Sequence, residues 1–218
     1  MSAGTVVVVG AGPGVSGSLA QRYAEEGWSV GLIGRDGAQV RALAERLAGT
    51  GVDVAVEVAD VTDTEAAALA VRRLGERFGR VDALHVHPSA FREKDPLELT
   101  VPELLADVAL GVGALLTAVQ AARPFLHRGA RITVTGSMAA DKPWHRAASL
   151  GVQKAGVRNL VLSLDATLRD EGIRAVSVTV NGTLADDGPF HPDRVADALL
   201  DATRQDEGDW RAEVPYDG

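Results

Sequence analysis

The sequence predicts an α/β fold, in which helices flank a doubly wound parallel sheet of six to seven strands. Three observations support this prediction. Short apolar runs alternate with longer helical patterns along all 218 residues. Each apolar run is nearly continuous in Val, Ile and Leu, which is typical of strands covered on both faces. A helical pattern separates successive runs, so the expected connections are βαβ units.

Six strands are predicted, and a seventh is expected near the C-terminus. The strands cover Thr5–Gly10, Ser29–Ile33, Asp53–Val58, Ala83–His87, Arg131–Thr135 and Ala175–Val180, with the seventh around Arg211–Val214. The helices cover Gly14–Glu26, Ala38–Leu47, Thr64–Phe78, Pro102–Leu126, Ala147–Asp170 and Val195–Thr203. Thr62 precedes Glu65 at the spacing of a capping box, and Thr100 precedes Glu103 at the same spacing. Pro192 lies where the last helix would begin.

Composition limits the domain organisation and the partners. No repeat or linker divides the chain, so residues 1–218 are read as one domain. The net charge is −8 without a basic block, which argues against nucleic acid or a membrane surface as partner. Disulfides and thiolate chemistry are excluded, because the chain has no cysteine. The N-terminus, Met1–Gly4, lacks a basic signal region, and no apolar run approaches the roughly 20 residues of a membrane span. We therefore expect a cytoplasmic protein.

A glycine-rich segment, GAGPGVSG, leads from the first predicted strand into the first predicted helix. Glycines let the backbone approach a pyrophosphate closely, and a helix N-terminus supplies free amides and positive partial charge. In one register, Gly10, Gly14 and Ser16 fit G-x-x-x-G-x-G with serine at the last position. In the other, Gly12, Gly14 and Gly17 fit G-x-G-x-x-G. Either register predicts dinucleotide binding, and the alternative is a glycine turn without a ligand.

The end of the second predicted strand bears on the choice of cofactor. Gly34 stands where an NAD site places a carboxylate for the ribose 2′-hydroxyl, and Arg35 follows it. An arginine at this place suits the 2′-phosphate of NADP(H). The alternative for Arg35 is a solvated loop charge. The sequence therefore favours NADP(H) over NAD(H).

Several segments, taken in chain order, resemble the short-chain dehydrogenase/reductase family from Thr5 to about Gly218. They are Gly10-x-x-x-Gly14-x-Ser16, Asp60–Asp63, Val81–Leu84, Thr135–Ser137, Lys154–Val157 and Gly172–Val176. No single segment is specific, but their order and spacing together are. The resemblance implies a single Rossmann domain that binds NAD(P) and acts as an oxidoreductase on a small organic metabolite.

The resemblance also implies roles for individual residues. Ser137 would polarise the substrate oxygen, and Lys154 would hold the nicotinamide ribose. The implied cofactor contacts are Gly10, Gly12, Gly14, Val15, Ser16, Arg35, Asp60, Val61, Ser89, Lys154 and Thr183. Without a ligand, Ser137 would cap the chain as it leaves its strand, and Lys154 would be a solvated charge. The chain has only three lysines, the others being Lys94 and Lys142, so this placement favours the cofactor site.

Four departures from the family pattern meet at the same site. Leu150 stands at the tyrosine of the family's Tyr-x-x-x-Lys, which ends at Lys154 here. Ala109 stands at the helix asparagine, Val86–Ser89 at the Asn-Asn-Ala-Gly segment, and Asn181 at the proline of a Pro-Gly turn. In the family the tyrosine gives a proton to the substrate oxygen, and such a donor must lie within hydrogen-bond reach. Leucine has no exchangeable proton, so the ordinary Ser-Tyr-Lys mechanism is not expected.

Two histidines are candidates to replace the missing acid. His87 ends the fourth predicted strand, at the edge where open α/β sheets bind ligands. His145 lies in the loop before the lysine helix, and we group it with Ser137 and Lys154 as a catalytic candidate. Histidine titrates near neutrality and serves as acid or base, although each could instead be a hydrogen-bonded structural residue. His85 shares a strand face with His87, but no third ligand lies near, so no metal site is expected.

Three functions remain open from the sequence. The first is an NADP(H)-binding oxidoreductase that either reduces an electrophile whose product needs little acid assistance or takes its proton from His145 or water. The second is a non-redox enzyme of the same fold, a lyase, isomerase or cyclase, in which Leu150 is a pocket wall. The third is a catalytically silent dinucleotide-binding protein, suggested by the same losses and by the short segment Leu184–His191.

Self-association is also expected. The helices predicted over Pro102–Leu126 and Ala147–Asp170 carry apolar residues around much of their circumference, which is more than one face against a sheet can bury. In the resembled family such helices pair across a two-fold axis. A homodimer or homotetramer follows, with a small molecule as the other partner.

Overall fold

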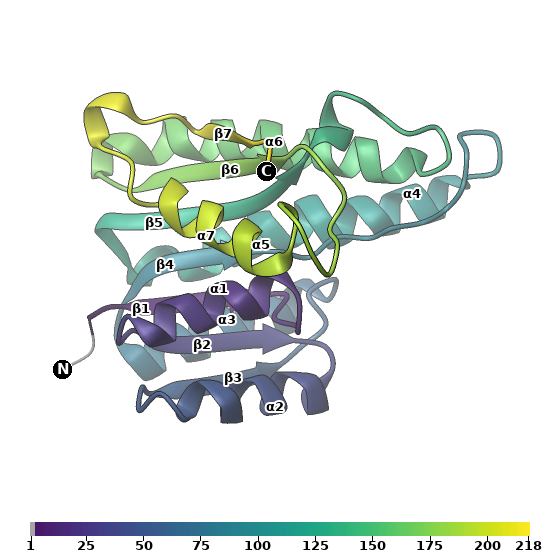
Figure 1. Cartoon of the computed structure of the whole chain (residues 1–218). Helices are drawn as coiled ribbons and strands as arrows, with labels where there is room; N and C mark the ends of the chain where they lie inside the picture. Colours follow the sequence, from purple (N-terminus) through teal and green to yellow (C-terminus); the bar gives the residue numbers. More distant parts are fainter. Residues whose placement is uncertain (1–2) are drawn as a thin grey trace.

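All seven strands form one parallel sheet, in the order β3-β2-β1-β4-β5-β6-β7 (Figure 1). The computed structural model describes residues 3–218; Met1 and Ser2, part of the stretch read for a signal region, lie outside the described residues. The strands are β1 Thr5–Val9, β2 Ser29–Gly34, β3 Val54–Val58, β4 Val81–Val86, β5 Leu126–Ser137, β6 Arg174–Val180 and β7 Glu213–Tyr216. This architecture confirms the predicted doubly wound α/β fold.

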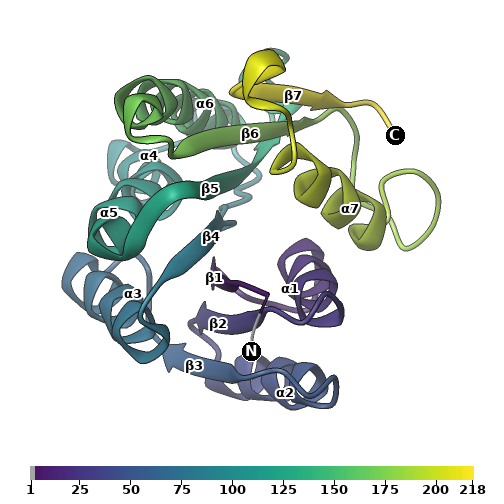
Figure 2. The ribbon, with the colours of Figure 1, turned by 90° about the vertical axis from the view of Figure 1, so that its left-hand side faces the viewer.

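Helices cover both faces of the sheet, as the end-on view shows (Figure 2). One face is covered by α1, α2 and α7, and the other by α3, α4, α5 and α6. Their bounds are α1 Val15–Glu25, α2 Gly37–Ala48, α3 Thr64–Phe78, α4 Val101–Val108, α5 Ala114–Ala122, α6 Ala148–Leu168 and α7 Pro192–Ala202. The right-handed crossovers expected of parallel strands require this two-sided covering.

The core divides into two apolar layers, one on each face of the sheet. In β1, Val6 and Val8 belong to the layer under α1 and α7, whereas Val7 and Val9 belong to the layer under α3 and α5. Side chains alternate between the faces of a strand, so both sets must be apolar when both faces are covered. All four valines are at most 1% exposed, and burial of each contributes roughly 1.5 kcal/mol or more.

The long helix predicted over Pro102–Leu126 is interrupted. A π-helical turn, Ala109–Gly113, separates α4 from α5, and a 3-10 turn at Arg123–Phe125 ends the stretch before β5. Gly111 lies in the π turn, where a Cβ atom would come within 2.4 Å of the Cγ of Gln153 on α6. The π turn and α6 therefore pack at a distance that only a glycine at position 111 allows. The wider π-helical turn occurs at this contact.

The predicted helix starts were partly correct. Thr100 and Glu103 form the expected reciprocal capping box at the start of α4. The capping box predicted for Thr62 and Glu65 is wrong. Asp63 caps α3 instead, and its carboxylate accepts from the amides of the first turn. The Thr62 hydroxyl donates instead to Asp60, at 2.7 Å. A carboxylate at the residue before the helix has displaced the threonine as the N-cap.

The C-terminal elements differ from the prediction by two or three residues. Helix α7 begins at Pro192, the position expected for a proline at the first turn, with His191 as N-cap. Strand β7 covers Glu213–Tyr216 rather than Arg211–Val214, because its register pairs Glu213 with Ser177 of β6.

The stretch from residue 101 to residue 125 has the length and composition of a membrane span, alone among the helices of residues 3–218. The expectation that no apolar run approaches this length needs correction here. In the fold, α5 packs against α3 and contributes Leu115, Ala118 and Val119 to the core. A buried core helix meets the same criteria, so this stretch does not place the protein in a membrane.

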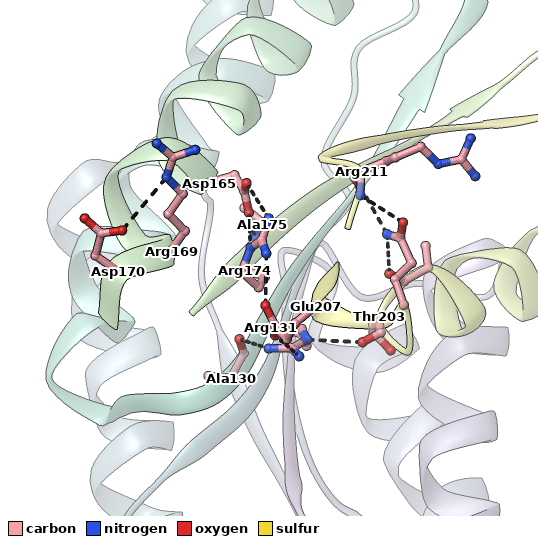
Figure 3. A network of polar contacts seen from close by, with 12 residues as sticks. Ala130, Arg131, Asp165, Arg169, Asp170, Arg174, Ala175, Thr203, Glu207 and Arg211 are labelled. Atoms are coloured by element: carbon pink, nitrogen blue, oxygen red, sulfur yellow. Dashed lines mark hydrogen bonds and ion pairs between the residues drawn. The ribbon is translucent and has the colours of Figure 1, made fainter. Parts of the chain in front are cut away.

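A polar network ties the C-terminal segment to the starts of β5 and β6 (Figure 3). Arg174 donates to both carboxylate oxygens of Asp165 on α6, at 2.9 and 3.0 Å. Glu207 accepts from Arg131 at 2.7 Å and from Arg174 at 2.9 Å. Both guanidinium groups lie over the Trp210 ring, 5.1 and 4.7 Å from its centroid. These contacts are at the amino ends of the strands, so the carboxyl ends remain available for a site.

Candidate active site

The glycine loop begins directly after β1. Gly10 has a φ of +83°, a left-handed conformation that favours glycine. Its amide and that of Ala11 donate to the Ile33 carbonyl of β2, at 2.9 and 2.8 Å. A Cβ at Gly10 would lie 2.8 Å from the Cδ of Pro88, which follows β4. Gly10 is therefore required both by the turn and by the contact between two loops.

Both predicted glycine registers describe part of this loop. Ser16 is 2% exposed, and its hydroxyl donates to the Gly10 carbonyl and accepts from the Gly12 amide, each at 3.1 Å. A serine therefore replaces the third glycine of the first register by bracing the loop from inside. Gly17, the last glycine of the second register, would place a Cβ 2.3 Å from the Gly12 carbonyl oxygen. Each register captures one packing requirement of the same turn.

The N-terminus of α1 is open. Gly12 and Gly14 would place a Cβ with nothing within 4 Å, so packing within the chain does not demand glycine at either position. Gly14 is the N-cap and provides no side-chain hydrogen bond to the first turn, which starts at Val15. Uncapped amides at the positive end of a helix are a ready anion site. The open space over these glycines fits a pyrophosphate.

A cavity of about 220 Å³ adjoins this loop. Its lining comes from the ends of β1, β2, β3 and β4 and from the π turn: Gly10, Ala11, Gly34, Arg35, Ala59, Asp60, Val61, Pro88, Ser89 and Leu110. The lining includes six of the positions predicted to contact the cofactor or to select it. Loops from four neighbouring strands meet here because β1 and β4 are adjacent, at the point where the strand order reverses.

Arg35 and Asp60 place opposite charges at the mouth of the cavity. The Arg35 side chain is 83% exposed and lies 3.9 Å from a carboxylate oxygen of Asp60. The pKa of Asp60 is lowered, mainly by the Thr62 hydroxyl and amide that donate to it and further by Arg35. Asp60 therefore stays ionised, and the weakly held guanidinium of Arg35 is free to turn towards a phosphate.

Gln153, which sequence reasoning missed, fixes the loop that carries Ser89. Gln153 is fully buried on α6. Its amide nitrogen donates to the Asp107 carbonyl at 2.6 Å, and its oxygen accepts from the Ser89 hydroxyl at 2.9 Å. One side chain thus joins α4, α6 and the loop after β4. The sequence did contain a signal for Gln153, because it is a polar residue directly before Lys154 in a helix of mostly apolar residues.

Lys154 is the buried cation of the site. It is 6% exposed, and its Nζ donates to the Thr135 carbonyl of β5 at 2.9 Å. Burial lowers the pKa of Lys154 from 10.5 to about 8. No carboxylate pairs with Lys154 in residues 3–218, unlike the arginines of the network in Figure 3. The solvated surface lysine, which was the alternative for this residue, is not what the structure shows.

Two histidines of β4 and its end lie beside the lysine. His87 Nδ1 is 2.9 Å from the Thr135 hydroxyl, and His85 Nδ1 is 3.2 Å from the Thr133 hydroxyl. The rings stack at 5.8 Å between centroids. Burial, followed by the charge of Lys154, lowers the pKa of His87 to about 4, and burial lowers that of His85 further below its ordinary value. Both rings are neutral at pH 7.

Ser137 ends β5, at the same edge of the sheet as Lys154. Its hydroxyl accepts from the Ala139 amide at 3.2 Å, so it caps the 3-10 turn that follows, as its structural alternative predicted. The hydroxyl proton stays available for another acceptor. Leu150 is partly buried on α6, one turn before Lys154. Thr183 is exposed in the loop after β6 and lies outside the cavity lining.

His145 lies in a different depression. It is exposed and lines an apolar groove of about 560 Å³. Ala148 and Val152 of α6 line the same groove. Residues two apart on a helix point in nearly opposite directions, so this face of α6 is turned away from that of Leu150 and Lys154. The structure does not bring His145 together with the other two catalytic candidates.

A parallel sheet whose first strand ends in an open glycine loop defines a dinucleotide-binding α/β protein. More narrowly, the chain belongs to the short chain dehydrogenase family, whose sequence pattern matches residues 4–187. Sulfoacetaldehyde reductase 2 of Chromohalobacter salexigens is 29% identical over 79% of this chain and 70% of that protein. Serine 3-dehydrogenase of Rhizobium radiobacter is 28% identical over 80% and 70%.

Solved structures share the fold over nearly the whole chain. A dehydrogenase/reductase from Sinorhizobium meliloti 1021 superposes with a TM-score of 0.90 at 24% identity and covers 100% of this chain and 95% of that one. A metagenomic short-chain oxidoreductase, solved in complex with NADP, gives 0.87 at 23% identity, with 98% and 96% covered.

The buried lysine makes a prediction about stability. Between pH 8 and 10.5 the unfolded chain holds a proton that folded Lys154 has released, so stability rises with pH through this window. Below pH 8 the full cost of burying the charge is present, roughly 3 kcal/mol. We expect Lys154→Met to raise the free energy of unfolding at pH 7 by roughly 1–3 kcal/mol, the lower values reflecting the unpaired Thr135 carbonyl.

Urea denaturation at pH 7 and at pH 9.5 measures this effect. The gain should shrink at the higher pH, and Lys142→Met, in an exposed loop, should change little at either. A Lys154→Met protein that is less stable than wild type at pH 7 would show that the buried charge of Lys154 does not destabilise the fold.

Proposed function

We propose that this protein is an NADP(H)-dependent oxidoreductase that interconverts a small organic carbonyl compound and its alcohol. The observation that carries the proposal is the buried, unpaired charge of Lys154, which lies at the same carboxyl edge of the sheet as the open anion site at α1. A buried charge without a countercharge costs stability and is typical of functional sites. Family membership and the reductase and dehydrogenase names of the relatives support the same reaction class.

Each part of the site has a task in this proposal. The amides at the start of α1 bind the pyrophosphate, and the cavity beside Gly34 takes the adenosine half of the dinucleotide. Lys154 donates to the nicotinamide ribose, and Ser137 donates a hydrogen bond to the substrate oxygen. The bound dinucleotide supplies the hydride. Because Leu150 stands where the family's tyrosine is expected, the proton reaches the substrate oxygen by another route.

The preference for NADP(H) rests on Arg35. No carboxylate ends β2 to accept from a ribose 2′-hydroxyl, since Gly34 stands there, and a Cβ at Gly34 would lie 2.8 Å from the Ala11 carbonyl oxygen. The exposed guanidinium that follows can donate two hydrogen bonds to a 2′-phosphate. Two solved structures of the same fold are complexes with NADP, which is in line with this preference.

Arg35→Ala tests the preference. A hydrogen bond between charged groups is worth roughly 1.5–3 kcal/mol, so the Kd for NADPH should rise roughly 10- to 100-fold. The Kd for NADH should stay within about two-fold, because NADH has no 2′-phosphate. Isothermal titration measures both, with Arg46→Ala, an exposed arginine of the same region, as control. Equal losses for the two dinucleotides would refute the role of Arg35.

The reaction itself is tested by following NADPH oxidation with a panel of small aldehydes and ketones. We expect turnover of at least one carbonyl compound, lowered roughly 100-fold or more by Ser137→Ala, because one donor to the developing oxyanion is lost. Ser163→Ala, on the exposed side of α6, is the matched control. Formation of product without NADPH would point to a non-redox enzyme. NADPH binding without any turnover would point to a silent dinucleotide-binding protein.

We also propose that the protein assembles into a symmetric homodimer or homotetramer through α4, α5 and α6. These helices expose large apolar side chains on the layer seen at the left of Figure 2, with Leu105 61%, Leu116 41%, Val152 51% and Leu162 43% exposed. Apolar surface of this kind is typically buried by a second copy. Sedimentation equilibrium should show a dimer or tetramer, and Leu162→Glu should lower the number of subunits in the assembly. A wild-type monomer at micromolar concentration would contradict the proposed assembly.

A further inference from the structure

Thr135 joins a lysine and a histidine at the carboxyl end of β5. Its carbonyl accepts from Lys154 Nζ at 2.9 Å, and its hydroxyl oxygen lies 2.9 Å from His87 Nδ1. Three elements, β4, β5 and α6, thus bring two titratable groups to one residue. Ser137 follows two residues later on the same strand. His87 and Lys154 therefore lie at the same edge of the sheet as Ser137, the residue proposed to contact the substrate.

Lys154 has spare hydrogen-bonding capacity. An ammonium has three N–H donors, and within residues 3–218 only the Thr135 carbonyl accepts one. The remaining donors have no described partner, although the side chain is 94% buried. A merely structural ammonium in such a place would be expected to have its donors satisfied or a carboxylate nearby. The incomplete shell leaves two N–H donors of Lys154 that ligand oxygens can accept from.

The groups around Lys154 offer no competing charge. The titratable side chains that face it come from β4 and its end, and they are His85 and His87, both neutral at pH 7. Neither β5 nor α6 adds a carboxylate next to the ammonium. Asp107, the buried carboxylate of α4, is held by Arg92 at 2.9 and 3.0 Å. The proton on Lys154 is therefore not fixed by an ion pair.

No tyrosine can act as the proton donor at this site, and the residue at the family's tyrosine position cannot either. Leu150, one turn before Lys154, has no exchangeable proton. Tyr23 is 2% exposed on α1 and packs on Trp28, 4.9 Å between ring centroids. Tyr216 donates its hydroxyl to the Pro189 carbonyl at 2.5 Å. These are the only two tyrosines of the chain, so neither phenol is free at the site.

We propose that Lys154 is the proton donor of this site. The inference rests on the proposed function. In the reducing direction the carbonyl carbon receives a hydride with its electron pair, supplied by the bound dinucleotide, and the π pair of the C=O bond moves to oxygen. One Nζ–H bond of Lys154 breaks and an O–H bond forms on that oxygen. Lys154 is left as a neutral amine and regains a proton from water.

Protonation states decide between Lys154 and His87 as the donor. With a pKa of about 8, Lys154 carries its proton in roughly nine of ten molecules at pH 7. His87, with a pKa of about 4, is protonated in roughly one molecule in a thousand. A general acid works best when its pKa lies near the working pH, so Lys154 is the effective acid and His87 remains a neutral neighbour.

The first test measures Lys154 in the protein without ligand. Lysine labelled with ¹³C at Cε gives three resonances, because the chain has three lysines, and Lys→Arg variants assign them. The Lys154 resonance should titrate with a midpoint near pH 8, below the ordinary lysine value of 10.5. A Lys154 midpoint at the ordinary lysine value overturns the proposal, whether or not the protein turns over a substrate.

The second test uses single-turnover kinetics of the intact enzyme. The rate should fall about tenfold per pH unit above the Lys154 midpoint, as the ammonium is lost. Lys154→Arg keeps the charge but holds its proton far more tightly. We expect its rate to fall at least 100-fold at pH 7, while the Kd for NADPH changes less than about five-fold. Lys142→Arg, in an exposed loop, is the matched control and should behave as wild type.

The outcomes separate the two proposals. A Lys154→Arg enzyme with the wild-type rate, or a wild-type rate that is constant from pH 7 to 10, overturns the acid role and leaves the proposed function standing. A wild-type protein that oxidises NADPH with none of the carbonyl compounds removes the proposed function and the acid role together.

Discussion

The adjacency of β1 and β4 at the centre of a fully parallel sheet constrains the rest of the molecule. The chain leaves these two strands towards opposite faces, so their carboxyl ends form a crevice that no helix covers. Gly10 and Pro88 meet there closely enough that a Cβ at Gly10 would collide with the proline ring. Both faces of the sheet must be apolar to hold this arrangement, which explains the valine-rich strands. Ser16, Gln153 and Lys154 are among the polar residues that remain buried, and they lie on the side of the sheet where the strands end.

A half-buried arginine and a buried lysine have opposite surroundings in this protein. Arg174 is paired with Asp165 and Glu207 and lies over Trp210, so its charge is compensated at the amino ends of the strands. Lys154 has one carbonyl oxygen and two neutral histidines around it. Removing a carboxylate partner of Arg174 would leave the arginine charge uncompensated. Replacing Lys154 with an uncharged residue would instead remove a charge that is already uncompensated. The compensated charge therefore lies at one edge of the sheet, and the uncompensated one lies at the edge of the proposed site.

Gln153 and the π turn connect the helical layer to the cofactor loop. Gly111 allows α6 to approach, and Gln153 then reaches both the Asp107 carbonyl and the Ser89 hydroxyl. The loop after β4 is therefore set by a buried amide that belongs to the lysine helix. A movement of α6, for example on assembly with a second copy, would therefore displace Ser89 and Lys154 together. The proposed catalytic and cofactor-binding parts of the site are therefore both contacted by α6.

Hydrophobic periodicity predicted the parallel α/β fold and the order of its elements along the chain, and the spacing of the glycines predicted the loop after the first strand. Burial on both faces and a tight turn leave strong local patterns. Six of the expected cofactor and selectivity positions line one cavity for the same reason, since strand ends converge wherever the sheet is parallel. Contacts between distant segments were decided only by the tertiary structure. The π turn at Gly111, the Thr135 carbonyl that accepts from Lys154 and the separate groove that His145 lines depend on packing across elements. Local sequence carries no record of such packing, because the same residue types satisfy it and a solvated surface equally well.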